Sequence, residues 1–208
     1  MAAADRLLVC LVGLSALLSG AAAAADDRPR LQSGIYEGLL LAVAADGHVS
    51  GYYREEQGEG VVKRCTFSLA GQVGVGAPGK ASLVSWSSTT LAGRLEAQKD
   101  AVSLAIPDGR EHSGCALVLL PAIATGLSLD KSAPAGWIEL RRISVPRANF
   151  FQDAAASKPM KAYVVAGDVV GVLAVQGELL QIDYVSRSGR KTSGWIKAAQ
   201  ADRLVPPQ

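Results

Sequence analysis

The feature that most constrains this chain is the alternation of short apolar runs and turn residues over its last third, residues 143–208. In order, these runs and turns are 145–151, 162–166, Gly167-Asp168, 169–175, Gln176-Gly177, 179–185, Ser188-Gly189-Arg190 and Gly194-Trp195-Ile196. Apolar runs of this length between glycine-containing turns are typical of β-strands joined by tight hairpins. The pattern predicts a small, self-contained β-barrel.

The preceding part of the chain also has the pattern of β-structure. Asp46-Gly47 separates two apolar runs, 35–43 and 49–53, and is a strong hairpin signal. Further short strands are predicted at 61–69, 81–86, 92–95, 102–106, 115–120 and 137–140. No stretch after the leader keeps a helical period over three turns, so helices should be short or absent. The sequence therefore predicts an all-β protein, with an antiparallel β-sandwich or barrel over 34–142 and the small barrel over 143–208; residues 125–136 are expected to form a loop before a boundary near Arg142.

The N-terminus has the layout of a secretory signal peptide over residues 1–25. A short segment with one basic residue precedes an apolar core at 7–18, and small residues with several Ala-x-Ala cleavage choices follow. The core is too short for a spanning helix, although an uncleaved anchor is the alternative. Residues 26–33 are polar and suit a flexible N-terminus. We expect a periplasmic or secreted protein with no membrane span in its mature form.

Cleavage of the leader would remove Cys10 and leave two of the three cysteines, Cys65 and Cys115. Both lie in apolar, strand-like runs of an exported chain, so the simplest prediction is that they form a disulfide. A reactive cysteine or a metal ligand is the alternative. Two thiols and two distant histidines make a poor metal site, and we predict no metal and no cofactor.

Residues 145–204 resemble the bacterial SH3 family, whose members carry a small five-stranded barrel appended to exported proteins. The matching elements are the run 162–173 with its Gly167-Asp168 turn, Gly177 before the strand that bears Ile182 and Val185, Gly194-Trp195-Ile196, and the closing Asp202-Arg203-Leu204. The resemblance implies a binding barrel, often one for peptidoglycan. It implies a function in contacting a periplasmic protein or a cell-wall ligand.

Candidate contact residues in this barrel are aromatic and basic. Phe151 and Tyr184 are expected to be exposed, whereas Phe150, Tyr163 and Trp195 are expected in the core. Arg187, Arg190 and Lys191 crowd the last predicted turn. They could pair with carboxylates of a ligand or protect a strand edge from pairing, and the sequence favours neither.

In the first domain, the charged segment 108–112 lies beside the predicted disulfide. Arg110, Glu111 and His112 are candidates for contacting a protein partner. An enzyme would need His112 as a base and Ser113 as a nucleophile, without the turn that exposes such a serine, so we predict that the protein is not an enzyme. The acidic run 55–60 is expected to be a solvated turn, because its spacing fits no calcium loop.

Two functions therefore stand as hypotheses. The first is an exported, non-enzymatic binding protein that contacts a periplasmic protein or cell-wall ligand through the SH3-like domain. The alternative is an inhibitor or immunity-type protein that blocks a cell-wall-degrading enzyme with the segment 108–112. The formal net charge of +2 and the lack of a basic block argue against nucleic acid as a partner.

Overall fold

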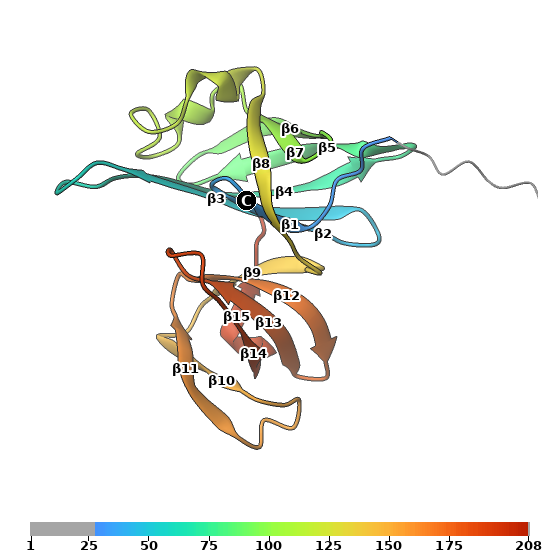
Figure 1. Ribbon diagram of the computed structural model, residues 1–208, viewed down its shortest axis with the longest axis vertical. Coiled ribbons are helices and arrows are strands. Elements are labelled where there is room, and N and C mark those ends of the chain that lie inside the picture. The colour runs from blue at the N-terminus through green and yellow to red at the C-terminus, as the bar shows by residue number, and fades with distance from the viewer. Residues whose placement is uncertain (1–27, 208) are drawn as a thin grey trace, which may run out of the picture.

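The computed structural model describes residues 28–207, which form a β-barrel and a curled β-sheet stacked along the long axis of the molecule (Figure 1). Within this range, three short 3-10 helices accompany the strands: η1 (Gly109–Glu111), η2 (Pro121–Ala124) and η3 (Ala198–Gln200). The predicted all-β class is thus confirmed. No helix in this part of the chain is long and apolar enough to cross a membrane. The predicted signal peptide, 1–25, lies outside the described residues.

The first unit is a closed, eight-stranded barrel in which each strand pairs antiparallel with the next, and the last strand pairs with the first. Its strands are β1 (Gly34–Tyr36), β2 (Leu39–Val43), β3 (His48–Gln57), β4 (Lys63–Gly74), β5 (Ala77–Trp86), β6 (Thr90–Ala97), β7 (Ala101–Ala105) and β8 (Leu127–Pro134). Of the two architectures left open by the sequence, the structure has the barrel. Closure leaves no unpaired edge in this unit.

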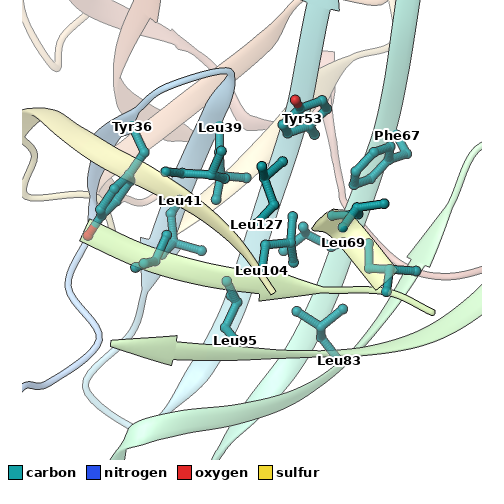
Figure 2. Close-up of a cluster of buried hydrophobic side chains, with 14 of the residues drawn as sticks. Tyr36, Leu39, Leu41, Tyr53, Phe67, Leu69, Leu83, Leu95, Leu104 and Leu127 are labelled. Carbon is teal, nitrogen blue, oxygen red and sulfur yellow. The ribbon is translucent and has the colours of Figure 1, made fainter. Parts of the chain in front are cut away.

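Side chains that alternate along the strands fill the interior of the barrel. In β3, buried and partly exposed residues follow each other with a period of two, as strand geometry requires. The inward residues include Leu41, Leu69, Leu95 and Leu104, all fully buried, and Phe67 stands with them (Figure 2). A barrel of eight strands is just wide enough for such side chains to fill it. Its interior is therefore a packed core.

The segment before β1 is bound to the barrel. Leu31 is buried in the barrel core, and its N–H donates to the carbonyl of Pro78 at 3.0 Å. The hydroxyl of Ser33 donates to the carbonyl of Trp137 at 2.7 Å and accepts from the N–H of Val43 at 2.8 Å. The expectation of a flexible N-terminus is therefore wrong for residues 31–33, because these contacts fix them.

Residues 125–136 do not form the expected loop, because most of them belong to β8. Leu127 and Leu129 face the barrel core, while Ser128 and Asp130 face outward. This strand pairs with both β7 and β1 and so closes the barrel. The alternation of apolar and polar residues is short and ends at Pro134, so the glycine and proline residues of this segment favour a loop more strongly than the two leucines favour a strand.

The predicted strand at 115–120 is also wrong. These residues form a series of turns between η1 and η2, in which the N–H of Leu119 donates to the carbonyl of Cys115 at 2.9 Å. Cys115, Val118 and Leu119 are nevertheless buried and join the barrel core. A short apolar run cannot distinguish a strand from a buried turn segment. Here the run covers one face of the barrel, away from the second sheet (Figure 1).

The second unit is an open, curled sheet of seven strands. In spatial order, these are β11 (Pro159–Val165), β10 (Arg147–Phe151), β14 (Lys191–Lys197), β13 (Leu179–Val185), β12 (Val169–Gln176), β9 (Glu139–Ile143) and β15 (Ala201–Arg203). The strands and turns predicted from Val145 onward are therefore present. The self-contained barrel predicted over 143–208 is not confirmed, because the sheet remains open and β9, which begins before residue 143, pairs with β12 and β15. Because β9 pairs with β12 and β15, the chain passes from barrel to sheet between Pro134 and Glu139, ahead of the boundary predicted near Arg142.

The core of the sheet contains Phe150 but not every aromatic residue expected there. Phe150 is fully buried, and a Cβ at Gly194 would lie 2.7 Å from its ring, so β14 and β10 approach closely only because residue 194 is glycine. Trp195 is only half-buried. The core placement of Tyr163 is wrong: its side chain is 49% exposed, because β11 is an edge strand, and its ring lies 3.8 Å from the guanidinium carbon of Arg147.

A third apolar cluster joins the barrel to the sheet. It centres on Trp137, which is buried with Ala42 from the barrel and Leu140 and Leu204 from the sheet. The indole N–H of Trp137 donates to the buried carboxylate of Asp183 at 3.0 Å. This cluster sets how the two units sit against each other.

Polar contacts between β9 and the barrel strands β3 and β4 extend this interface. The N–H of Leu140 donates to the hydroxyl of Ser50 at 2.8 Å. The guanidinium of Arg142 donates to the hydroxyl of Ser68 at 2.9 Å, and its central carbon lies 5.3 Å from the centre of the Tyr52 ring. The two units therefore form a defined interface with apolar and polar parts.

Candidate functional site between barrel and sheet

A groove of about 720 Å³ lies beside this interface, between the outer face of the barrel and two turns of the sheet. The barrel side comes from β1 to β4. The sheet side comes from the β11–β12 turn, residues 165–169, and from the end of β13 with the turn that follows, residues 184–189. Ligand sites of this size form preferentially at interfaces between domains. This groove is the candidate functional site.

Strand alternation places the side chains on the barrel side of the groove. On β3, Tyr52, Arg54 and Glu56 point outward, while Tyr53 between them is buried in the barrel. The residues opposite Arg54 and Glu56 on β4 are Thr66 and Arg64. Along β3, the outward side chains therefore change from the half-buried ring of Tyr52, beside the interface, to the charged groups of Arg54 and Glu56.

Glu56 links the two sides of the groove. Its carboxylate oxygen accepts a hydrogen bond from Arg64 Nε at 2.7 Å and lies 3.8 Å from Arg187 Nε on the sheet. The hydrogen bond from Arg64 lowers the pKa of Glu56, and the positive charges of Arg187, Arg64 and Arg54 act in the same direction. Glu56 is therefore ionised at neutral pH and pairs with both Arg64 and Arg187.

Tyr184 and Asp168 line the sheet side of the groove. The hydroxyl of Tyr184 donates to one oxygen of Asp168 at 3.3 Å, and the other oxygen accepts from the N–H of Val165 at 2.9 Å. Burial, and then the charge of Asp168, raise the pKa of Tyr184, so the phenol is neutral and remains a donor. Both oxygens of Asp168 are thus engaged within the sheet.

Arg54 differs from the other charged groups in the groove. Its side chain is half-buried, yet within residues 28–207 its guanidinium makes no hydrogen bond or ion pair. Its positive charge favours the ionised forms of Glu56 and Tyr184, and so acts to lower the pKa of both groups. The groove therefore holds a positive charge without a direct partner in the described structure.

The five candidate contact residues predicted in the second domain lie in three different places. Tyr184 and Arg187 line the groove. Arg190 is exposed in the β13–β14 turn beside it, and Lys191 lies 3.5 Å from the carboxylate of Asp183. Phe151 is half-buried on β10, opposite Trp195, and does not line the groove.

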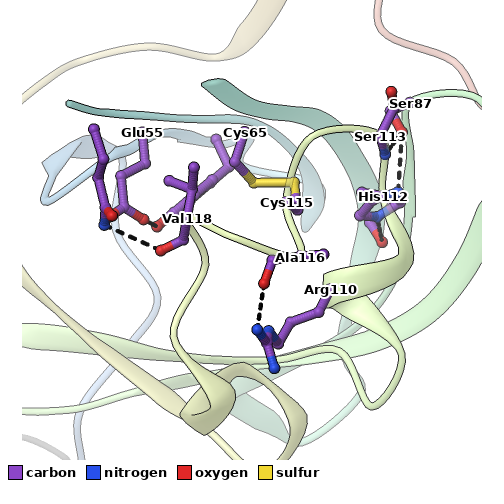
Figure 3. The surroundings of a disulfide bond; sticks show 12 residues. Glu55, Cys65, Ser87, Arg110, His112, Ser113, Cys115, Ala116 and Val118 are labelled. Atoms are coloured by element: carbon purple, nitrogen blue, oxygen red, sulfur yellow. Dashed lines mark hydrogen bonds between the residues drawn. A yellow bond between two sulfur atoms is a disulfide. The ribbon is translucent and has the colours of Figure 1, made fainter. Parts of the chain in front are cut away.

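None of residues 108–112 lines the groove, and His112 is buried inside the barrel unit. His112 is 1% exposed, and one ring nitrogen lies 3.2 Å from the hydroxyl of Ser87 (Figure 3). Its other ring nitrogen lies 2.9 Å from the hydroxyl of Ser85, and the ring stacks on Phe67. His112, predicted as a contact residue, is therefore not accessible to a partner, because its side chain packs inward. Arg110 and Glu111 are exposed, and Arg110 donates to the carbonyl of Ala116.

The disulfide predicted between Cys65 and Cys115 is present, and it ties this segment to β4 (Figure 3). It connects residues that are 50 positions apart in the chain. Gln57 adds a second tie, since its side-chain amide donates to the carbonyl of Val118 at 3.1 Å. The segment between η1 and η2 is thus fixed on the barrel.

Sequence reasoning missed the barrel side of the groove. Glu56 was expected in a solvated turn, but β3 continues to Gln57, so Glu56 lies on a strand that faces the sheet. Arg54 and Arg64 carried no local motif. The available signal was the alternation Tyr52, Arg54, Glu56, which places three large polar or aromatic side chains on one strand face.

Among residues 28–207, no group of three or more His, Cys, Asp or Glu side chains is placed to hold a metal ion. No family model matches the chain, and neither a curated protein nor a solved structure matches it significantly.

Proposed function

We propose that this chain is an exported, non-enzymatic binding protein whose ligand site is the groove between the barrel and the sheet. The observation that carries the proposal is the groove itself: it has the volume of a ligand site, lies at an interface between two units, and combines tyrosine rings with charged side chains. Aromatic rings supply contact area at small entropic cost, and charged groups supply orientation.

Export is part of the proposal and has two supports. The predicted leader at 1–25 directs secretion, and the Cys65–Cys115 disulfide is the kind of bond that persists in an oxidising compartment. The periplasm or the cell exterior is therefore the proposed location. A protein of the cell envelope or a peptidoglycan fragment is the proposed ligand.

The proposal includes an SH3-like character for the second unit. The paired strands β12, β13 and β14 and the positive φ of Gly167, Gly177 and Gly189 in their turns support it. The sheet has seven strands, so the proposed likeness concerns the strands from β10 onward, with β9 as an addition between β12 and β15.

The test is a titration of the mature, disulfide-bonded chain with soluble peptidoglycan fragments and a pool of short synthetic peptides, followed by amide NMR shifts. We expect a saturable response at residues 165–169, 184–189 and 52–56. Ala166→Trp fills the groove from an exposed turn and should abolish the response, whereas Ala155→Trp, in an exposed loop of the same sheet, should retain it. A response centred elsewhere, or equal in both variants, would show that the groove is not the ligand site.

The second candidate is an inhibitor of a cell-wall-degrading enzyme, and the segment fixed by the disulfide favours it. Arg110 and Glu111 are exposed there, and Leu117 is 70% exposed on a backbone that is already ordered. Preorganised loops lose little entropy on binding. If this candidate is correct, the pure protein slows a purified wall hydrolase, and Leu117→Asp removes the effect. Val75→Asp, at another exposed position, is the control and should retain it. Hydrolysis that is unchanged by the protein eliminates this candidate.

A further inference from the structure

The groove holds five formal charges, three from arginine and two from carboxylates. Glu56 is engaged by Arg64 and Arg187, and both oxygens of Asp168 accept hydrogen bonds from Tyr184 and the backbone of the sheet. The remaining cation is Arg54. An unpaired guanidinium at a half-buried position is a recognition group for an anion, because a bound anion supplies the partner that the fold leaves out.

A second free donor lies opposite Arg54. Thr66 is its partner across the β3–β4 ladder, and its hydroxyl makes no hydrogen bond within the described residues. Directly opposed side chains on neighbouring strands have Cβ atoms about 5 Å apart. A guanidinium and a hydroxyl at this spacing suit the several oxygens of one carboxylate or phosphate.

We propose that the groove recognises an oxyanion on its ligand, a carboxylate or a phosphate, through Arg54 with Thr66 beside it. This inference rests on the proposed function and adds the chemical class of the ligand. Glu56 and Arg187 meet across the groove at 3.8 Å, so each has a partner of opposite charge. Arg54 therefore provides the charge that the ligand meets, and the ring of Tyr52 provides the neighbouring apolar surface.

The experiment follows the arginine Nε–Hε NMR signals of the mature, disulfide-bonded chain during titration with three probes. The probes are the peptide Ac-Ala-Glu-Ala-NH2, its neutral counterpart Ac-Ala-Gln-Ala-NH2, and inorganic phosphate. We expect the Arg54 signal to shift saturably with the glutamate peptide, with phosphate or with both, and not with the glutamine peptide. The two anionic probes distinguish a carboxylate from a phosphate ligand. Added salt should weaken the response.

Two variants provide the comparison. Arg54→Gln should weaken binding of the anionic probe about tenfold or more, the effect of losing a charge-assisted hydrogen bond. Arg94→Gln removes the same charge from β6, on another side of the barrel, and should leave affinity unchanged. Equal binding of the glutamate and glutamine peptides, or equal affinities in the two variants, would overturn the inference.

The outcomes also separate this inference from the proposed function. If the neutral peptide shifts the groove amides and Ala166→Trp abolishes that response, the groove binds ligands but does not select an oxyanion. If none of the three probes shifts the Arg54 signal, the oxyanion inference is wrong, and the wider titration above decides the function of the groove.

Discussion

Replacing Gly171 with alanine tests how the sheet is seated on the barrel. Gly171 lies on β12 directly beneath the indole of Trp137. A Cβ at this position would lie 2.3 to 2.5 Å from three indole carbons, whereas ordinary contact is 3.4–4 Å. The ring or the strand would therefore have to move by about 1 Å. Either movement strains the hydrogen bond from Trp137 to the buried Asp183.

The expected effect is the balance of three contributions. The φ of Gly171 is not positive, so alanine suits the backbone and by itself would stabilise by about 0.4–1 kcal/mol. Overpacking costs about 1–3 kcal/mol, and a buried polar pair that loses its hydrogen bond costs about 1–3 kcal/mol more. We expect Gly171→Ala to lower the free energy of unfolding by about 1–6 kcal/mol.

Urea denaturation of the disulfide-bonded chain, followed by tryptophan fluorescence and circular dichroism, measures this change. Gly136→Ala is the matched control, because its Cβ would lie 3.6 Å from Leu173 and its φ is also not positive. In a Trp137→Leu background the cost of Gly171→Ala should shrink by about 1 kcal/mol or more, since neighbouring residues couple. A neutral Gly171→Ala, or a cost unchanged by Trp137→Leu, would refute the role given to this contact.

Two further predictions concern the barrel. Replacing both Cys65 and Cys115 with alanine should lower the free energy of unfolding by about 4 kcal/mol in the chain-entropy estimate for a 50-residue separation; a shift in the urea transition worth under about 1 kcal/mol would contradict it. Burial lowers the pKa of His112 below 6.5, so as pH falls through that value the unfolded chain takes up a proton that the folded chain resists, and stability is lost. The free energy of unfolding, measured from about pH 7.5 to about 5, should therefore fall with pH in the exposed control His48→Gln and fall less in His112→Gln. An equal fall in the two variants would count against a lowered pKa for His112.

Much of the strand arrangement was accessible from local sequence. The Asp46-Gly47 turn joins β2 to β3, and the strand predicted at 179–185 is β13 with the same bounds. These features depend on neighbouring residues: glycine permits positive φ, and apolar runs bounded by turns favour strands. The cysteine pairing was also accessible, because few alternatives remained.

The predictions from the sequence were wrong where contacts with distant residues decide the local structure. Cys115–Leu120 has the apolar character of a strand but forms turns that cover the barrel. Leu127–Pro134 has few apolar residues and a terminal proline, yet pairing on both sides makes it the closing strand. His112 lies among charged neighbours, and its burial depends on Ser85 of β5, Ser87 of the β5–β6 turn and Phe67 of β4.

The candidate site shows the same division. Tyr184 and Arg187 were predicted because a cluster of basic and aromatic side chains is visible in one short segment. Arg54 and Glu56 were not, because alternating polar residues on a barrel strand have the same pattern whether they face water or a neighbouring unit.

The strand-and-turn character of the chain follows from its local sequence, because backbone preferences and alternating burial act between residues a few positions apart. The groove between the barrel and the sheet arises from long-range packing. The packing around Trp137 brings Arg187 to within 3.8 Å of Glu56, although the two are far apart in the chain, and no local pattern records a contact between separate units.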